Sequence, residues 1–278
     1  MPITARKFLS RGAALSADEE ARFFAAIKAA NGTFKTTMAN RMPEIDAALA
    51  EVLIDAGILT PVVLDAAVSS GVTTLDLREA LIARHLHPSI VATDILVNAR
   101  LIDLDRQTRA LVDDRGHPLQ FDIMGVAVSP WHGRLHTLLG LGLISGIMMR
   151  KLARHVPASG GPGDVVKLVT QRLTRAPSVE VIEDDLGIPN PRLFKRFDLV
   201  RAANVLNRAY FDDAAIARMA RSLATYLKGE GGLLLVNRTH ADGANHGTLF
   251  RLTGGRFVPR RRFGSGSEIE PIIDAITV

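Results

Sequence analysis

The chain contains no cysteine, which excludes disulfide bridges and thiolate metal sites. This absence fits a reducing compartment, and we therefore expect a cytoplasmic location. Association with a membrane surface is the open alternative. Residues 1–7 lack the apolar core of a secretory signal. No apolar run reaches the about 20 residues that a membrane-spanning helix needs. With 47% hydrophobic and 23% charged residues, the composition predicts a globular core.

The chain carries a small excess of positive charge, with 34 lysines and arginines against 29 acidic residues. We interpret the net charge of +5 as an arginine-rich, solvated surface, although attraction to an anionic partner such as nucleic acid or a lipid headgroup is the alternative. The basic run 260–262 has no interleaved aromatic residues, which a single-strand binding groove uses. A nucleic-acid partner is therefore not favoured.

Strand-like and helix-like segments alternate from residue 59 onward, which predicts a parallel sheet with right-handed crossovers. Near the end, two strand-like segments flank the turn 253–255, which indicates an antiparallel hairpin over 248–259. The predicted strands are 61–67, 89–93, 179–182, 197–203 and 233–236, and the predicted helices are 73–85, 97–112 and 212–228.

Residues 1–56 carry helical patterns instead of this alternation. Ser16 is suited to cap a helix that runs to about residue 30, and apolar residues recur at helical spacing over 43–56. We predict an N-terminal helical cap over 1–56, placed beside a main domain over 57–278.

An insertion at about 113–177 interrupts the main domain. Its segment 138–149 is almost wholly apolar and is followed by basic residues at 150, 151 and 154. One interpretation is a buried helix. The other is a hydrophobic flap, by which residues 135–154 contact a lipid-like substrate or a membrane surface. The sequence does not indicate an oligomeric state.

The segment 62–94 predicts a nucleoside-binding edge. A buried strand leads into a turn of small residues ending at Gly71, then into a helix, and then into a second strand that ends at Asp94. Parallel sheets hold nucleoside cofactors at such carboxyl edges, where small residues let backbone approach the ligand and an acid accepts hydrogen bonds from ribose hydroxyls.

The turn itself resembles that of class I methyltransferases, which commonly carry an acid followed by glycines at alternate positions. In this chain Asp65 is followed by Ala67, Ser69 and Gly71 at those positions. A dehydrogenase turn needs its glycines to seat a pyrophosphate on a helix N-terminus, whereas S-adenosylmethionine has no phosphate. The resemblance therefore implies S-adenosyl-L-methionine as the cofactor.

Three further segments resemble the chemotaxis-receptor (CheR-like) methyltransferases. They are the turn 66–71, the strand end 92–95, and the strand 197–206 with the following 210–212. The segment 227–235 is similar to the entry to the fifth strand of the class I sheet. Residues 72–74 depart from the family, which has acids after the turn glycine. The resemblance implies an α/β, Rossmann-like class I methyltransferase sheet, mostly parallel with a C-terminal antiparallel hairpin, but not the substrate.

The resemblance also implies a set of site residues. Asp65, Ala67, Ser69 and Gly71 form the turn at the methionine moiety, Asp94 binds the ribose, Asp184 or Asp185 with Leu186 lies near the adenine, and Asn204, Val205 and Leu206 lie beneath the methyl group. Plain alternatives stay open: Asp94 caps the following helix, Asp184 and Asp185 are solvated loop acids, and Asn204 only satisfies loop backbone groups.

Methyl transfer from a sulfonium is an in-line displacement in which the protein aligns the acceptor and excludes water. Asn204 and Tyr210 are the candidate catalytic residues. Tyr210 is suited to steer or deprotonate an acceptor, and a core tyrosine is an equal alternative. We predict no metal. We predict a methyltransferase for a small-molecule or lipid-like acceptor. The alternatives are a protein side-chain (carboxylate) methyltransferase and a non-catalytic binding or regulatory protein.

Overall fold

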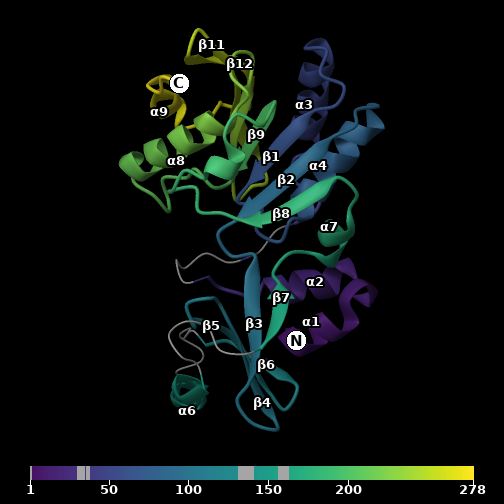
Figure 1. Cartoon of the computed structure of the whole chain (residues 1–278), viewed down its shortest axis with the longest axis vertical. Coiled ribbons are helices and arrows are strands. Elements are labelled where there is room, and N and C mark those ends of the chain that lie inside the picture. The colour runs from purple at the N-terminus through teal and green to yellow at the C-terminus, as the bar shows by residue number, and fades with distance from the viewer. Residues whose placement is uncertain (1, 30–34, 36–37, 131–140, 156–162) are drawn as a thin grey trace. The chain divides into compact units, whose positions relative to one another are not determined.

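The computed structural model describes the chain except residues 1, 30–34, 36–37, 131–140 and 156–162 (Figure 1). The chain forms two compact units, each with its own sheet. The first comprises Met1–Thr37 with Leu96–Arg172, and the second comprises Met38–Ile95 with Leu173–Val278. This division differs from the predicted boundary at residue 56, because residues 38–56 fold with the larger sheet and residues 96–112 with the smaller one.

The second unit is built on a seven-stranded sheet in the order β12-β11-β10-β9-β1-β2-β8. Strands β8, β2, β1, β9 and β10 pair in parallel, whereas β11 and β12 pair antiparallel. This arrangement confirms the predicted α/β sheet, which is mostly parallel and ends in a C-terminal antiparallel hairpin. The strands are β1 Val62–Ala66, β2 Ser89–Asp94, β8 Val179–Glu183, β9 Leu199–Ala203, β10 Leu233–Thr239, β11 Asn245–Thr253 and β12 Arg256–Phe263.

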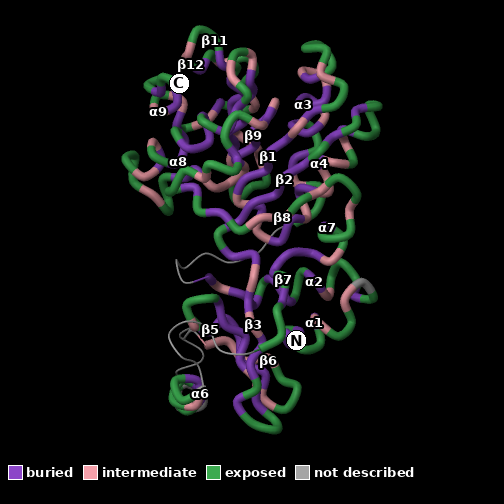
Figure 2. The backbone as a smooth tube through the Cα atoms, in the orientation of Figure 1, coloured by how far each residue is buried: buried purple, intermediate pink, exposed green. Residues whose placement is uncertain are grey.

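Helices cover both faces of this sheet, so its central strands are buried on both sides, as parallel strands require (Figure 2). Val63 and Leu199 share one hydrophobic cluster with α3 (Pro43–Asp55) and α4 (Val72–Ala83). Their sequence neighbours Leu64 and Val200 share the other cluster with α8 (Asp213–Tyr226) and α9 (Glu270–Asp274). The predicted helices over 43–56, 73–85 and 212–228 are thereby confirmed. The short α7 (Gln171–Arg175) and η2 (Pro191–Leu193) flank β8 in the chain.

The first unit contains a five-stranded antiparallel sheet in the order β6-β5-β4-β3-β7. The prediction of a helix over 97–112 is wrong, because this segment forms β3 and β4. The Asp105 carboxylate accepts the Gln107 N–H and makes a tight turn where the helix would continue. The strands are β3 Asn98–Asp103, β4 Thr108–Val112, β5 Pro118–Ile123, β6 Val126–Val128 and β7 Asp164–Lys167.

The N-terminal helices α1 (Ala5–Arg11) and α2 (Ala17–Phe24) pack on this smaller sheet, with η1 (Gly12–Ala14) between them. Ser16 caps α2 as predicted, in a capping box with Glu19. The helix ends at Phe24, earlier than predicted, and Phe24 is buried against Phe8 and Phe23.

The apolar run of the insertion leads into α6 (Leu141–His155). Met148 and Leu152 are buried against β3, β4 and β5, whereas Ile147 and Met149 are exposed at 48% and 43%. The described part of α6 is therefore half-buried. The other part of the predicted membrane-contact segment 135–154, residues 135–140, lies outside the described residues. Within the described part of the chain, no helix has the length and apolarity needed to cross a membrane.

Candidate cofactor site

Most of the predicted site residues lie at or just after the carboxyl ends of neighbouring strands in the seven-stranded sheet, on both sides of β1. The chain passes from β1 through α4 to β2 on one side, and β9 pairs with β1 on the other. Strand order thus reverses beside β1, and ligands of open α/β sheets bind in the crevice at such a switch point. The turn 67–71 follows β1, Asp94 ends β2, Asp184 follows β8 and Asn204 follows β9.

The turn after β1 has an alternating left-handed backbone. Ala67, Ser69 and Gly71 have φ angles of 57°, 58° and 77°. These are the three positions where the sequence resemblance expects glycine. For a residue other than glycine the left-handed conformation costs roughly 1–2 kcal/mol. The chain therefore adopts a glycine-type turn with alanine and serine in two of the three places, and such strain concentrates at functional sites.

The end of β2 holds this turn in place. The Asp94 Oδ2 accepts the Ser69 N–H at 2.7 Å, and the Thr93 carbonyl accepts the Val68 N–H at 2.9 Å. Asp94 is buried, with 8% of its surface exposed. The alternative role of Asp94 as a helix cap is wrong, because β3 and not a helix follows β2. Asp94 thus lies against the turn, where a ribose-binding acid is expected.

Asp184 and Asp185 differ sharply in their surroundings. Asp184 is buried; its Oδ1 accepts a hydrogen bond from Asn190, while its buried Oδ2 has no partner among the described residues. Burial raises the pKa of Asp184 above its ordinary value, with a smaller contribution from Asp185. Asp185 is exposed and accepts the Gly187 N–H, and Leu186 is buried in the core. Of these two acids, only Asp184 therefore has a buried oxygen available to accept a hydrogen bond.

Two more buried polar atoms at this edge lack hydrogen-bond partners within the described chain, the hydroxyl oxygens of Ser70 and Thr93. Ser70 is 1% exposed and Thr93 is fully buried. Buried polar groups without partners are uncommon and costly in folded proteins. Together with the Asp184 oxygen, they make this edge of the sheet a candidate site for a polar ligand.

Asn204 links the ends of β9 and β10. It has a φ of 61°, its N–H donates to the Asn237 carbonyl, and its Oδ1 accepts the Thr239 N–H at 2.7 Å. The structure therefore shows the backbone-satisfying role that was the alternative for Asn204. Of the neighbouring predicted residues, Leu206 is buried and Val205 is half-buried against the core, whereas Tyr210 is 62% exposed. Their contacts with cofactor or acceptor remain predictions.

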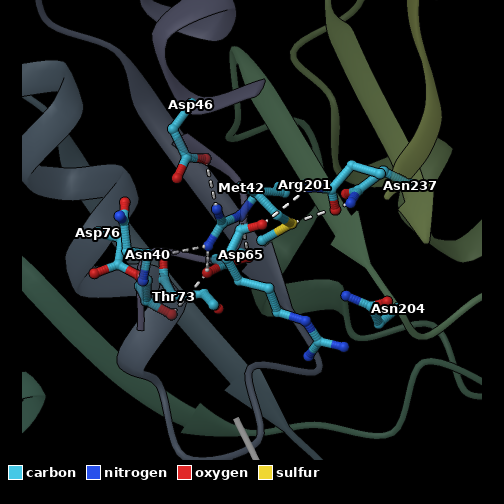
Figure 3. A network of polar contacts seen from close by, with 12 residues as sticks. Asn40, Met42, Asp46, Asp65, Thr73, Asp76, Arg201, Asn204 and Asn237 are labelled. Carbon is cyan, nitrogen blue, oxygen red and sulfur yellow. Dashed lines mark hydrogen bonds and ion pairs between the residues drawn. The ribbon is translucent and has the colours of Figure 1, made fainter. Parts of the chain in front are cut away.

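The sequence reasoning missed Arg201, a fully buried arginine in the middle of β9 (Figure 3). Its Nε and Nη2 donate to the two carboxylate oxygens of Asp65 at 2.8 and 2.6 Å. Its Nη1 donates to Asp46 of α3 at 2.9 Å, and Nη2 also donates to the Thr73 carbonyl at 2.8 Å. Asp65 is thus engaged on the face of the sheet that α3 and α4 cover, and its predicted contact with the methionine moiety remains a prediction.

This cluster holds two buried carboxylates against one guanidinium. Burial, with repulsion from Asp65 and Asp76, raises the pKa of Asp46 to about 6 despite its ion pair with Arg201. Burial opposes the charge of Arg201, but the two carboxylates outweigh it and raise the pKa of the guanidinium. One signal for the cluster was present in the sequence: an arginine inside an otherwise apolar strand needs anions beside it when that strand is central.

A cavity of about 150 Å³ lies at the same edge, beside the ends of β10 and β11. Leu206, His240 and His246 are among its lining residues. The two imidazoles meet edge to face, with ring centroids 4.7 Å apart. The His246 Nδ1 accepts the Ser265 N–H at 2.8 Å, so a neutral His246 carries its proton on Nε2. The described residues include no cluster of three or more side chains suited to hold a metal ion.

Comparisons with known proteins find structural matches at low identity and no match in sequence. No protein-family model matches the chain, and no curated protein matches it. Among solved structures, a putative S-adenosyl-L-methionine-dependent methyltransferase from Methanococcus maripaludis is 14% identical, with a TM-score of 0.32. The match covers 72% of this chain and 57% of that one.

Two other matches are more extensive. The 1,6-didemethyltoxoflavin-N1-methyltransferase from Burkholderia thailandensis is 11% identical, with a TM-score of 0.36, over 96% of this chain and 72% of that one. A putative protein-L-isoaspartate O-methyltransferase from Plasmodium falciparum is also 11% identical, with a TM-score of 0.36. That match covers 87% of this chain and 78% of that one. Both structures contain S-adenosylhomocysteine. At these identities and scores, the matches assign neither a subfamily nor an acceptor.

Proposed function

We propose that the protein is an S-adenosylmethionine-dependent methyltransferase that acts on a small-molecule or lipid-like acceptor. The observation that carries this proposal is the alternating left-handed turn at Ala67, Ser69 and Gly71, placed at the switch point of the sheet. A strained backbone at the edge where open α/β sheets bind ligands supports a binding function more strongly than a structural one.

The residues at this edge have complementary tasks in such a reaction. S-Adenosylmethionine supplies the activated methyl group. The buried Asp184 oxygen is suited to accept a hydrogen bond from the adenine amino group, and Asp94 to accept one from the ribose. Asn204 holds the loop after β9 against β10, and this fixes the backbone on which Val205 and Leu206 lie. Binding both reactants in one orientation supplies most of the rate advantage.

The cavity beside His240 and His246 supports a small acceptor or the small reactive end of a larger one. Its volume of about 150 Å³ is below that of a typical drug-sized pocket, about 300–1,000 Å³. A neutral His246 offers an Nε2–H donor, which is suited to orient a carbonyl, carboxylate or hydroxyl oxygen. Two apolar side chains of α6, Ile147 and Met149, are exposed, and they support including a lipid-like acceptor.

Calorimetric titration of the full chain with S-adenosylmethionine and S-adenosylhomocysteine tests the proposal. We expect both to bind, and Asp94→Asn to weaken binding by about 1.5–3 kcal/mol, since the charged hydrogen bonds to ribose are lost. Asparagine keeps an oxygen for the Ser69 N–H, so the turn is retained.

Asp198→Asn is the matched control, because Asp198 accepts the Val62 N–H at the amino end of β1 in the same way. We expect it to leave the affinity unchanged. Absence of binding by the wild-type chain would contradict the cofactor assignment. An unchanged affinity in Asp94→Asn would remove Asp94 from the site.

A further inference from the structure

The turn that follows β1 is anchored at both ends to one buried side chain. Asp65, two residues before Ala67, accepts two hydrogen bonds from the Arg201 guanidinium. Thr73, two residues after Gly71, offers its carbonyl to the same Nη2 at 2.8 Å. Figure 3 shows Asp65 and Thr73 converging on Arg201. A single guanidinium therefore fixes the entry to and the exit from the turn.

A second hydrogen bond closes this arrangement. The Thr74 hydroxyl, in the first turn of α4, donates to the Asp65 Oδ2 at 2.7 Å and is fully buried. The strand before the turn and the helix after it are thus tied to each other as well as to β9. Arg201 lies directly opposite Asp65 in the β1–β9 register, so the sheet itself sets the position of the guanidinium.

Stability alone gives little reason for such a cluster. Replacing buried ion pairs by apolar side chains of similar volume is often neutral or stabilising. The turn, by contrast, needs a constraint, because Ala67 and Ser69 hold φ angles that glycine would adopt freely. Relaxation of either residue would move the Ser69 N–H away from Asp94.

We propose that Arg201 is a positioning residue that clamps the cofactor turn from both ends and so keeps Ala67 and Ser69 in the left-handed conformation without glycine. The expected effect of Arg201 on cofactor binding rests on the proposed function. The clamp itself belongs to the ligand-free protein and is measurable there. Asp46 accepts a hydrogen bond from the Nη1 of Arg201 and is the second carboxylate beside this guanidinium.

The test compares Arg201→Lys with Lys228→Met. Lysine keeps the charge, but one ammonium cannot replace the planar fork that reaches Asp65 and Thr73 together. Lys228 pairs with Asp198 at the amino ends of β1 and β9, so its loss removes an ion pair from the same strands without touching the turn. Affinity for S-adenosylhomocysteine is measured by calorimetry at a temperature where circular dichroism shows every variant folded.

We expect Arg201→Lys to bind about tenfold more weakly, equivalent to about 1.4 kcal/mol, and Lys228→Met to bind as the wild type does. Adding Ala67→Gly and Ser69→Gly to Arg201→Lys should restore the affinity, because glycine removes the need for the clamp. Wild-type affinity in folded Arg201→Lys, or failure of the glycine pair to restore binding, would overturn the proposal.

Hydrogen exchange in the ligand-free protein separates this inference from the proposed function. Amides 68–75 should exchange faster in Arg201→Lys than in the wild type, and not in Lys228→Met. Unchanged exchange over 68–75 would contradict the clamp, whatever the ligand. If the wild type bound no S-adenosylhomocysteine, the proposed function would fail, while the exchange comparison would still decide the role of Arg201. If Arg201→Lys does not fold, Thr74→Val, which breaks only the hydroxyl contact to Asp65, is measured in the same way.

Discussion

The two ends of β1 and β9 have different physical chemistry. At the amino ends, Asp198 pairs with the half-exposed Lys228 and accepts the Val62 N–H, so these charges are satisfied near solvent. A buried ion cluster lies within the strands, between their middle and their carboxyl ends. Two strained non-glycine residues, and buried oxygens without partners among the described residues, lie at and beyond the carboxyl edge of the sheet. The same pair of strands thus carries paired charges near solvent toward its amino ends, and groups whose burial or strain costs folding free energy toward its carboxyl ends. Such costs are expected where function, rather than stability, determines the residues.

The largest expected effect breaks the buried cluster. Arg201→Met leaves the carboxylates of Asp65 and Asp46 buried without a cation, and we expect a loss of about 3–5 kcal/mol in the free energy of unfolding. Lys228→Met, at the amino ends, should cost only about 0–1 kcal/mol. Urea denaturation of both variants measures the difference. Equal losses of unfolding free energy would contradict the contrast between the buried ion pairs of Arg201 and the solvent-exposed ion pair of Lys228.

Glycine substitutions separate backbone strain from packing at the turn that follows β1. A Cβ at Gly71 would lie 2.4 Å from the Cδ2 of the buried Leu173, whereas at Gly57, with a similar φ of 72°, it would meet nothing within 4 Å. Gly57→Ala should cost roughly 1–2 kcal/mol for conformation alone. Gly71→Ala should cost about 1–3 kcal/mol more because of overpacking. Thermal unfolding measures both, and equal costs would contradict the close packing of the turn.

A smaller effect concerns the pH dependence of stability. The pKa of Asp46 is raised from 3.8 to about 6, so the folded state binds this proton more tightly than the unfolded chain does. The resulting stabilisation is complete below about pH 4 and is lost as pH rises to about 6, a change of up to about 3 kcal/mol. Asp46→Asn should lack this slope. Urea denaturation of both proteins at intervals from pH 4 to 7 measures this pH dependence. If the free energies of unfolding of the wild type and of Asp46→Asn changed equally with pH, Asp46 would not titrate in this range.

The fold of the seven-stranded sheet was predictable because its strands are short apolar runs that alternate with helix-like segments. The helix predicted over 212–228, for example, is α8, and Asp212 caps it. The smaller sheet was not predictable in the same way. The segment 97–112 is apolar enough for a helix, and only the turn at Asp105 separates its two strands.

The candidate site was predictable in its backbone but not in its side-chain contacts. The turn positions 67, 69 and 71 and the acid Asp94 followed from local sequence, because small residues and strand ends are visible there. The pairing of Asp65 with Arg201 joins residues 136 apart and depends on strand order. The partner of Asn204 was equally hidden, because it lies on β10.

Hydrogen exchange of the wild-type chain with and without S-adenosylhomocysteine tests the central claim most directly. Binding at the switch point should slow exchange in residues 67–72, at the end of β2 and over 184–186, and should leave the amino ends of β1 and β9 unchanged. Absence of protection at the carboxyl edge, or protection confined to another part of the chain, would contradict the account.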